Sequence, residues 1–169
     1  MDIYHEPTNE PRIGTRPSWD EYFMQITDMV ATRSTCLRRR VGAIFVRENR
    51  ILATGYNGSP SGLKHCDEVG CIRQQNNIES GRDLHLCRGA HAEANLITQC
   101  AKFGISAEGS TLYINASPCS LCMKMMVNVG VKKIVYRELY NDPLALQIAE
   151  EAELEMIKYT DKGGPKASC

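Results

Sequence analysis

Residues 91–122 read HAEANLITQCAKFGISAEGSTLYINASPCSLC, and this stretch decides the fold. Apolar residues at helical spacing run from Ala92 to Ala101, and Gly104 ends that pattern. Residues 110–116 then alternate like a strand, and Pro118 can open a second helix that runs to Gly130. This alternation of helix and strand predicts a layered α/β sheet.

Similar patterns extend outward on both sides of this stretch. The expected segments are helices at 19–35 and 143–151 and strands at 41–46, 51–55, 132–138 and 154–160. The first two of these strands are joined by a short charged segment, which is the pattern of a hairpin. Together the segments predict a mixed five-stranded sheet that begins with an antiparallel hairpin and has parallel pairs among its later strands.

The chain has 169 residues, of which 43% are hydrophobic, and this is enough for one well-packed core. We expect one domain over residues 18–160, between a flexible leader at 1–17 and a flexible tail at 161–169. Residues 56–89 are rich in glycine, asparagine, cysteine and charge and show no sustained period. A loop this long is usually functional or internally stapled, and its cysteines predict a metal-stapled insertion.

Lysine plus arginine and aspartate plus glutamate number 20 each, so the chain has no overall basic field. This balance argues against a long nucleic-acid partner and favours a small substrate. The first residues lack the apolar core of a signal peptide, and no run approaches membrane-spanning length. We therefore expect a cytoplasmic protein with no membrane partner, whose eight cysteines are free or hold metal.

Four residues of the deciding stretch have the types and spacing of a catalytic zinc site. Cys119 and Cys122 lie three apart at the start of one helix and share a face, and His91 lies at the start of the other. Zinc with three protein ligands keeps a fourth position for water, whose pKa it lowers toward about 7. Glu93 follows His91 in the first turn and can serve as a proton-carrying base.

The structural alternatives for these residues are a closed zinc site with an unseen fourth ligand and cysteines packed in the core. A Cys-x-x-Cys motif without a partner motif favours such structural interpretations. Here His-x-Glu is joined by Pro-Cys-x-x-Cys after a predicted strand, which is the signature of zinc deaminases. The sequence therefore indicates a hydrolytic zinc enzyme that replaces an amine on an electron-poor ring carbon.

Around these residues the chain resembles the cytidine and deoxycytidylate deaminase superfamily, and the resemblance runs from Trp19 to Thr160. The more selective segments are RSTC (33–36), GYNGSPSG (55–62) and AKFG (101–104), which are similar to deoxycytidylate deaminases and their relatives encoded beside bacterial competence genes. The resemblance implies a three-layer α-β-α fold with helices on both faces of the sheet. It also implies conversion of dCMP to dUMP with release of ammonia, which feeds thymidylate synthesis.

The same resemblance implies the zinc and proton-shuttle roles given above and adds two substrate contacts. Asn57 is similar to a residue that contacts the nucleotide. Tyr140 is similar to an aromatic residue that lies beside the substrate. The alternatives are a turn residue that tolerates positive φ for Asn57 and ordinary half-buried packing for Tyr140. Deoxycytidylate deaminases are commonly hexamers activated by dCTP and inhibited by dTTP, so the resemblance implies a homo-oligomer, a hexamer, with these two effectors.

A monophosphate substrate also needs a cationic partner in the protein. The three arginines at 38–40 and Lys64 offer charge near the relevant loops. A solvated basic face is the alternative for this run. The choice between a monophosphate and a triphosphate substrate stays open at this point.

Further ligand residues crowd the 56–89 segment, and Cys36 precedes the first strand. The expected second, structural zinc set is Cys36, Cys66, Cys71 and Cys87, with His65 or His85 as a substitute. Four thiolates, or three with one histidine, make a closed tetrahedral site. Some superfamily members have an extra zinc with cysteines matching Cys36 and Cys66, but Gly81 and Gly89 stand where those relatives have their other ligands. Reduced buried thiols or a redox-sensitive pair are the alternatives.

Two other functions have to be weighed against nucleotide deamination. A tRNA adenosine deaminase has almost the same zinc motif, but the neutral charge and GYNG (55–58) argue against it. A non-catalytic zinc module for protein contacts or DNA uptake is suggested by the competence-linked relatives, although it would have no need of Glu93. Cys100, Cys169 and His5 are expected to be bystanders.

Overall fold

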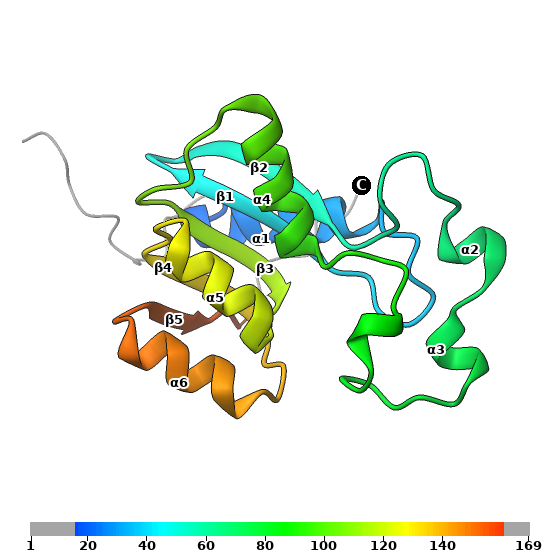
Figure 1. The fold of residues 1–169 in the computed structure, drawn as a ribbon. Helices are drawn as coiled ribbons and strands as arrows, with labels where there is room; N and C mark the ends of the chain where they lie inside the picture. Colours follow the sequence, from blue (N-terminus) through cyan, green and yellow to red (C-terminus); the bar gives the residue numbers. More distant parts are fainter. Residues whose placement is uncertain (1–15, 161–169) are drawn as a thin grey trace, which may run out of the picture.

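The computed structural model describes residues 16–160, whose centre is one mixed five-stranded sheet (Figure 1). Its strands are β1 (Gly42–Arg47), β2 (Arg50–Tyr56), β3 (Thr111–Ala116), β4 (Lys133–Glu138) and β5 (Glu155–Lys158). They lie in the order β2-β1-β3-β4-β5. β1 is antiparallel to both β2 and β3, whereas β3, β4 and β5 are parallel. The predicted antiparallel hairpin and later parallel pairs are confirmed.

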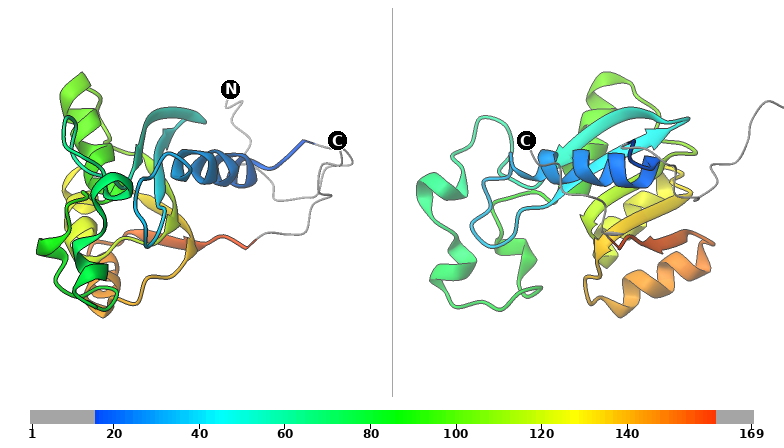
Figure 2. Two further views of the ribbon diagram at one scale, coloured as in Figure 1. Left: turned by 90° about the vertical axis from the view of Figure 1, so that its right-hand side faces the viewer. Right: turned by 180° about the vertical axis from the view of Figure 1, so that it is seen from behind.

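Helices cover both faces of the sheet, as the left view of Figure 2 shows. On one face lies α1 (Trp19–Ala31), where Phe23 and Met24 are buried in a core with residues of β1, β3 and β4. On the other face lie α4 (Ala92–Phe103), α5 (Ser120–Asn128) and α6 (Pro143–Glu151). They cover a larger core that includes Leu96 and Met123. The predicted three-layer arrangement is therefore confirmed.

α1 begins where the sequence predicts but ends earlier than expected. The Ser18 hydroxyl accepts a hydrogen bond from the Glu21 N–H at 3.2 Å and caps the first turn. At the other end the Thr32 hydroxyl donates to the Met29 carbonyl at 2.7 Å. Such local bonds compete with continuation of a helix, and α1 stops at Ala31 instead of near residue 35.

The residues between β2 and α4 form a lobe to one side of the sheet, where a metal-stapled loop insertion without helices was expected (Figure 1). The lobe contains α2 (Cys66–Val69), α3 (Ile72–Gln75) and a 3₁₀ turn, η1 (Leu84–Leu86). Each element has only three or four residues, too few to give a repeating apolar pattern. Paired backbone hydrogen bonds between Gly58 and Ala90, at 3.2 and 2.9 Å, close the base of the lobe.

Gly55 allows α4 to lie close against β2. A Cβ at this position would lie 2.5 Å from the Ala92 carbonyl oxygen and 2.7 Å from the Leu96 Cβ, so a larger residue would push the helix away. The Asn95 amide adds a hydrogen bond of 2.8 Å to the Tyr56 carbonyl. These contacts fix the N-terminal end of α4 relative to the sheet.

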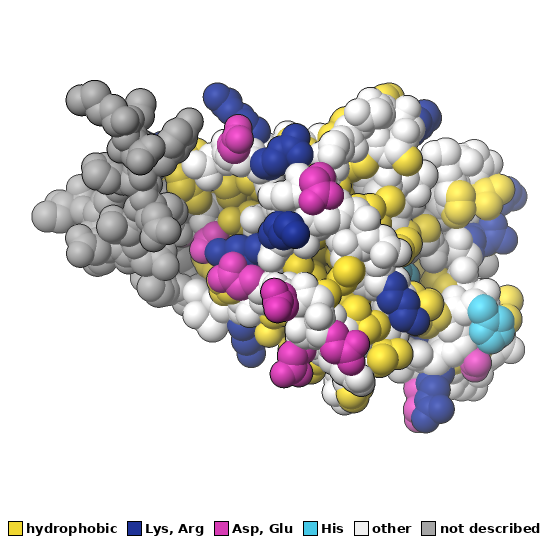
Figure 3. All heavy atoms as spheres, turned by 60° about the vertical axis from the view of Figure 1, so that its left-hand side comes forward, with side chains coloured by type: hydrophobic (Ala, Val, Ile, Leu, Met, Phe, Trp, Pro, Cys, Tyr) yellow, Lys and Arg dark blue, Asp and Glu magenta, His cyan; other side chains and the backbone are white. Residues whose placement is uncertain are grey.

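The longest helix in the described part of the chain, α1, has 13 residues, and no helix there is long and apolar enough to cross a membrane. On the face drawn in Figure 3, basic and acidic side chains are interspersed rather than gathered by sign. The expected tail at 161–169 and all but two residues of the expected leader at 1–17 lie outside the described residues, as do His5 and Cys169. The proposed domain boundaries stay predictions.

Candidate active site

The three predicted zinc ligands come together at the N-terminal ends of two helices. His91 directly precedes α4, Cys119 directly precedes α5, and Cys122 lies in the first turn of α5. The His91 Nδ1 atom is 3.6 Å from the Cys119 Sγ and 3.4 Å from the Cys122 Sγ. Within residues 16–160 no other group of three candidate ligand atoms lies within 4.8 Å of one another.

This donor set fits zinc. Two thiols and an imidazole are ligands that zinc prefers, and three protein ligands leave one position open. Neither His91 nor Cys119 uses its side chain to cap the helix that follows it, so both side chains are free to bind a metal. Hydrogen bonds to Cys122 and His91 lower the pKa of the Cys119 thiol, which favours the thiolate that binds metal.

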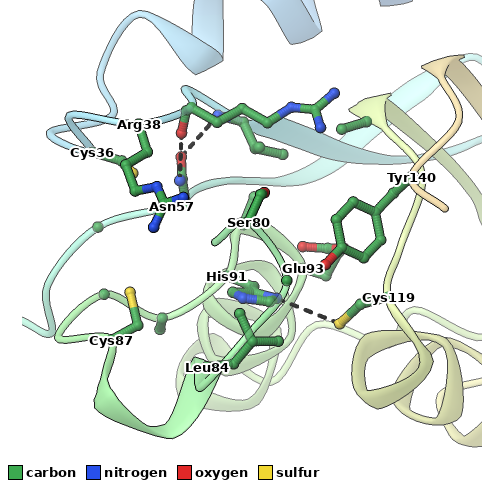
Figure 4. A pocket seen from close by; sticks show the side chains of 18 of the residues that line it. Cys36, Arg38, Asn57, Ser80, Leu84, Cys87, His91, Glu93, Cys119 and Tyr140 are labelled. Carbon is green, nitrogen blue, oxygen red and sulfur yellow. Dashed lines mark hydrogen bonds between the residues drawn. The ribbon is translucent and has the colours of Figure 1, made fainter. Parts of the chain in front are cut away.

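Glu93 lies in the first turn of α4 and is only 4% exposed. Burial raises the pKa of its carboxyl group to about 7, although a backbone hydrogen bond and His91 oppose the shift. A carboxyl group that titrates near neutral pH can both accept and release a proton during turnover. In Figure 4 its carboxylate lies between His91 and Tyr140. The position and pKa of Glu93 suit the predicted proton carrier.

Asp142, which was not predicted from the sequence, holds the helix start that carries the two cysteines. Its carboxylate accepts hydrogen bonds from the Ser120 N–H at 2.8 Å and the Ala145 N–H at 3.2 Å. It therefore caps α6 and also satisfies an N–H of α5 that the Cys119 side chain leaves unbonded. The Asp142-Pro143 pair is a readable helix-start signal for α6, but no local signal indicates the contact to Ser120.

Tyr140 lines the same pocket and is held from two sides. Its backbone N–H donates to the Ser117 hydroxyl at 2.8 Å, and the Ser117 N–H donates to the Glu138 carbonyl at 2.9 Å. Its phenol lies against the lobe, because a Cβ on Gly81 would be 2.6 Å from the Tyr140 hydroxyl. Gly81 also has a φ of +81°, which a glycine adopts without strain. The substrate contact of Tyr140 stays a prediction.

Asn57 also lines the pocket, and most of its amide group is used within the protein. Its Oδ1 accepts hydrogen bonds from the Ser34 hydroxyl at 2.6 Å and the Val41 N–H at 2.8 Å. Its Nδ2 donates to the Arg39 carbonyl at 2.8 Å, which leaves one N–H for a ligand. The alternative of a turn residue at positive φ is wrong, because the φ of Asn57 is not positive. Its nucleotide contact stays a prediction.

The pocket is open to solvent, and its empty space, the open mouth included, is about 960 Å³. Among the basic residues considered for a phosphate, Arg38 and Arg39 line it, whereas Arg40 and Lys64 do not. Arg38 donates to the Ile78 carbonyl at 2.7 Å, and Arg39 forms an ion pair with Glu138. A further arginine of the wall, Arg73 in α3, belongs to no motif and was not predicted.

The four cysteines of the predicted second zinc site lie in and beside the lobe, on the pocket wall. Their positions are Cys36, Cys66, Cys71 and Cys87, and all seven cysteines within the described range are free thiols. Burial raises the pKa of the Cys66 thiol, and Cys87, Cys71 and Cys36 raise it further, so the other three thiols lie around Cys66. In Figure 4, Cys36 and Cys87 lie across the pocket from Cys119.

The geometry of this second group is looser than that of the catalytic group. No three of its ligand atoms lie within 4.8 Å of one another. Of the two substitute ligands, His65 shares a hydrogen bond of 3.1 Å with the Thr35 hydroxyl, and His85 is exposed in η1. The second zinc therefore stays a prediction. Cys100 is buried in the core on α4, away from both groups, as expected of a bystander.

Comparison with known proteins identifies the class to which this fold and site belong. The family model described as the cytidine and deoxycytidylate deaminase zinc-binding region matches residues 17–138. The chain belongs to this family. Its relatives include a deoxycytidylate deaminase of Schizosaccharomyces pombe, which is 37% identical over 145 residues, or 85% of this chain and 45% of the yeast protein. They also include ComE operon protein 2 of Bacillus subtilis, which is 41% identical over 81% of this chain and 69% of that protein.

Solved structures agree with the family assignment. The structure of a dCMP deaminase from the cyanophage S-TIM5 in complex with dCMP and dUMP has a TM-score of 0.72 and is 31% identical. The match covers 86% of this chain and 100% of the phage chain, so the fold is that of the dCMP deaminases. The chain spans about half the length of the yeast deoxycytidylate deaminases that it matches, 45% and 48%.

Proposed function

We propose that this protein is a zinc-dependent deaminase that converts dCMP to dUMP and releases ammonia. The observation that carries the proposal is the meeting of His91, Cys119 and Cys122 beside the buried Glu93, at a pocket whose wall includes three of these residues. Family membership supports the reaction, and relatives named deoxycytidylate deaminase support the substrate. The product would supply thymidylate synthesis.

Different residues of the chain would bind the metal, transfer protons and position the substrate. His91, Cys119 and Cys122 would hold the zinc, which when bound makes water a good nucleophile at neutral pH. Glu93 takes a proton from the attacking water, delivers it to the ring nitrogen N3, and later protonates the departing amino group. The water oxygen first bonds to C4. Glu93 then moves the proton of the new C4 hydroxyl to the amino group, so that C4=O forms, the C4–amino bond breaks and ammonia leaves without a change in oxidation state. Asn57 and Tyr140 would position the nucleotide.

An ammonia-release assay with dCMP, cytidine, dCTP and a tRNA anticodon stem tests this proposal. We expect zinc-loaded protein to release ammonia from dCMP. Release from the RNA stem alone would support the tRNA adenosine deaminase, which the balance of 20 basic and 20 acidic residues does not favour. No release from any of the four would support a non-catalytic zinc module. Either of these results would reject dCMP deamination.

We also propose the second, structural zinc, held by Cys36, Cys66, Cys71 and Cys87. The gathering of three thiols around the buried Cys66 supports it, because a tetrahedral ion would satisfy all four sulfurs. A zinc there would tie the lobe to the segment that follows α1. Metal analysis of the purified protein should then give about two zinc ions per chain. A value near one would reject this site.

Regulation by dCTP and dTTP, assembly into hexamers and a cytoplasmic location are extensions of the same proposal, and they rest on the resemblance noted in the sequence. Titration of dCMP activity with dCTP and dTTP tests the effectors, with activation by the first and inhibition by the second expected. Sedimentation should give a mass about six times the 18.9 kDa of one chain if the hexamer forms. A mass equal to that of one chain would reject it.

A further inference from the structure

Arg73 is a buried cation on the wall of the candidate active site. It lies in α3, is 8% exposed, and lines the pocket together with His91, Glu93 and Tyr140. Arginine is almost never buried to this extent without a partner, because removing its charge from water is costly. The position of Arg73 is also fixed, since its own carbonyl accepts a hydrogen bond of 2.8 Å from the Ile78 N–H.

The described residues satisfy only part of this guanidinium. One terminal nitrogen donates to the Glu79 carbonyl at 2.9 Å, whereas the buried Nε has no hydrogen-bond partner. None of the three ion pairs found within residues 16–160 includes Arg73. A guanidinium has five N–H donors and a full positive charge. Among residues 16–160, Arg73 therefore has an unused donor and no anion paired with its charge.

The neighbouring charged groups do not supply that anion. Arg38 and Arg39 add positive charge to the same wall, and Glu93 is the one carboxylate among the described residues that line the pocket. Arg39 already has Glu138 as its partner. Burial raises the pKa of the Tyr140 hydroxyl, while Arg73 and Arg39 act to lower it, so both guanidinium groups lie near enough to act on this phenol.

We propose that Arg73 binds the 5′-phosphate of the substrate and so selects a nucleotide over a nucleoside. The inference rests on the proposed deamination of dCMP and names the residue that recognises its phosphate. The phosphate is the only group of a deoxycytidine nucleotide that carries full negative charge. It would balance the buried guanidinium, and its oxygens match the paired N–H donors of an arginine. Phosphate recognition would then belong to the lobe, with Arg38 and Arg39 adding positive charge on the same wall.

The test compares Arg73→Gln and Arg73→Lys with Arg50→Gln, a matched change of an exposed arginine in β2. For Arg73→Gln we expect kcat/KM for dCMP to fall about 10- to 100-fold, mainly through KM, and kcat/KM for deoxycytidine to stay within about twofold. The Kd of dUMP should weaken by the same factor while that of deoxyuridine does not change. Arg73→Lys should show an intermediate loss, and Arg50→Gln should match the unchanged protein.

The outcomes separate this inference from the proposed function. An equal loss on dCMP and deoxycytidine, with or without loss of zinc, would make Arg73 a structural residue and overturn the inference. Unchanged dCMP kinetics in Arg73→Gln would overturn it as well. If Arg73→Gln does not fold, the same comparison with Arg73→Lys decides. If the unchanged protein deaminates neither dCMP nor deoxycytidine, the proposed function fails. The Kd values of dUMP and deoxyuridine then test the inference separately, and equal values would overturn it.

Discussion

Glu93 combines deep burial with a position beside the three candidate metal ligands. Its carboxyl group would carry protons between water and the substrate, whereas the amide of a glutamine has the same shape but cannot. We therefore expect Glu93→Gln to lower kcat by about 10²- to 10⁴-fold while leaving the zinc content unchanged. Steady-state kinetics with dCMP and metal analysis of the same preparation measure both quantities.

The control for this substitution is Glu150→Gln, an exposed position on α6, which should keep full activity. Normal turnover by a zinc-loaded Glu93→Gln would contradict the proton-carrier role. A loss of zinc together with activity would show instead that the carboxylate holds the metal site together. The two measurements must therefore be made on one sample.

Residues that act through a short motif are the ones that the sequence could predict. His91, Cys119 and Cys122 were predicted because their types and spacing reflect the chemistry of one ion, and the structure brings their ligand atoms together. Arg73 and Asp142 act through contacts between segments that are distant in the chain or lack any period, so no local pattern indicates them. Their roles depend on the packing of the lobe and of α6.

At the scale of elements, Asp142 links the start of α5 to the start of α6. The Asp142→Ala change removes the partners of the Ser120 and Ala145 N–H groups, and each lost cap costs about 1 kcal/mol. We expect the free energy of unfolding to fall by about 1–2 kcal/mol and zinc to be lost to a chelator more readily. Asn141→Ala, at the exposed neighbouring position, is the control.

The pH dependence of this effect follows from the direction of the Asp142 pKa. Hydrogen bonds from the Ser120 and Ala145 N–H groups lower that pKa, so they stabilise the charged carboxylate. The stabilisation is present above the ordinary aspartate pKa of about 3.9 and disappears as pH falls through the lower folded value. Chemical denaturation of metal-free protein at pH 7 and at low pH would reveal it. If the free energies of unfolding of Asp142→Ala and the unchanged protein differ by the same amount at both pH values, the capping role is contradicted.

Tyr113 joins α1 to β3 through a hydrogen bond of 2.7 Å from its hydroxyl to the Asp20 carboxylate. Burial, and then this bond, raise the pKa of the Tyr113 hydroxyl. The neutral phenol therefore stabilises the folded state below the unfolded pKa of about 10, and this contribution is lost as pH rises above it. We expect Tyr113→Phe to lower the free energy of unfolding by about 1–2 kcal/mol at pH 7 and by less above pH 10.

Urea denaturation at pH 7 and above pH 10 measures the difference in the free energy of unfolding between Tyr113→Phe and the unchanged protein. Tyr22→Phe is the control, because Tyr22 lies on α1, the helix that carries Asp20, and is 42% exposed. If that difference in the free energy of unfolding grows above pH 10, the pKa of the Tyr113 hydroxyl is not raised in the folded state.

The long helices and the strands were predictable because each packs against a core and its apolar residues therefore recur with a regular period. The short α2, α3 and η1 were not, since one turn of helix gives no repeat. The end of α1 was also misjudged, because the Thr32 hydroxyl bond that accompanies it is a single local contact. Element type and order could thus be predicted from period, whereas boundaries depended on individual hydrogen bonds.

At the scale of the whole molecule, the two metal groups join different parts of the chain. The catalytic group connects α4 to α5 across the end of β3, whereas the second group would connect the lobe to the segment between α1 and β1. Neither core cluster of the sheet includes a residue of either metal group. Loss of one metal should therefore affect activity and stability separately.

Cys71→Ser and Cys119→Ser test this separation. Cys71→Ser should remove one zinc and lower the melting temperature by about 10 °C, because a structural site contributes folding energy, while kcat of the folded protein stays within about twofold. Cys119→Ser should also remove one zinc but abolish turnover, with a smaller change in melting temperature, since both helices of its site contribute residues to the buried core.

Calorimetry, metal analysis and dCMP kinetics at low temperature provide the three measurements for each variant. Cys100→Ala is the matched control, because Cys100 is a buried cysteine of α4 outside both groups, and it should keep both zinc ions and full kcat. A large loss of kcat in folded Cys71→Ser without a fall in melting temperature would contradict its structural role. Such a result would place the lobe's thiols within the catalytic machinery, where they would face the same pocket as Glu93.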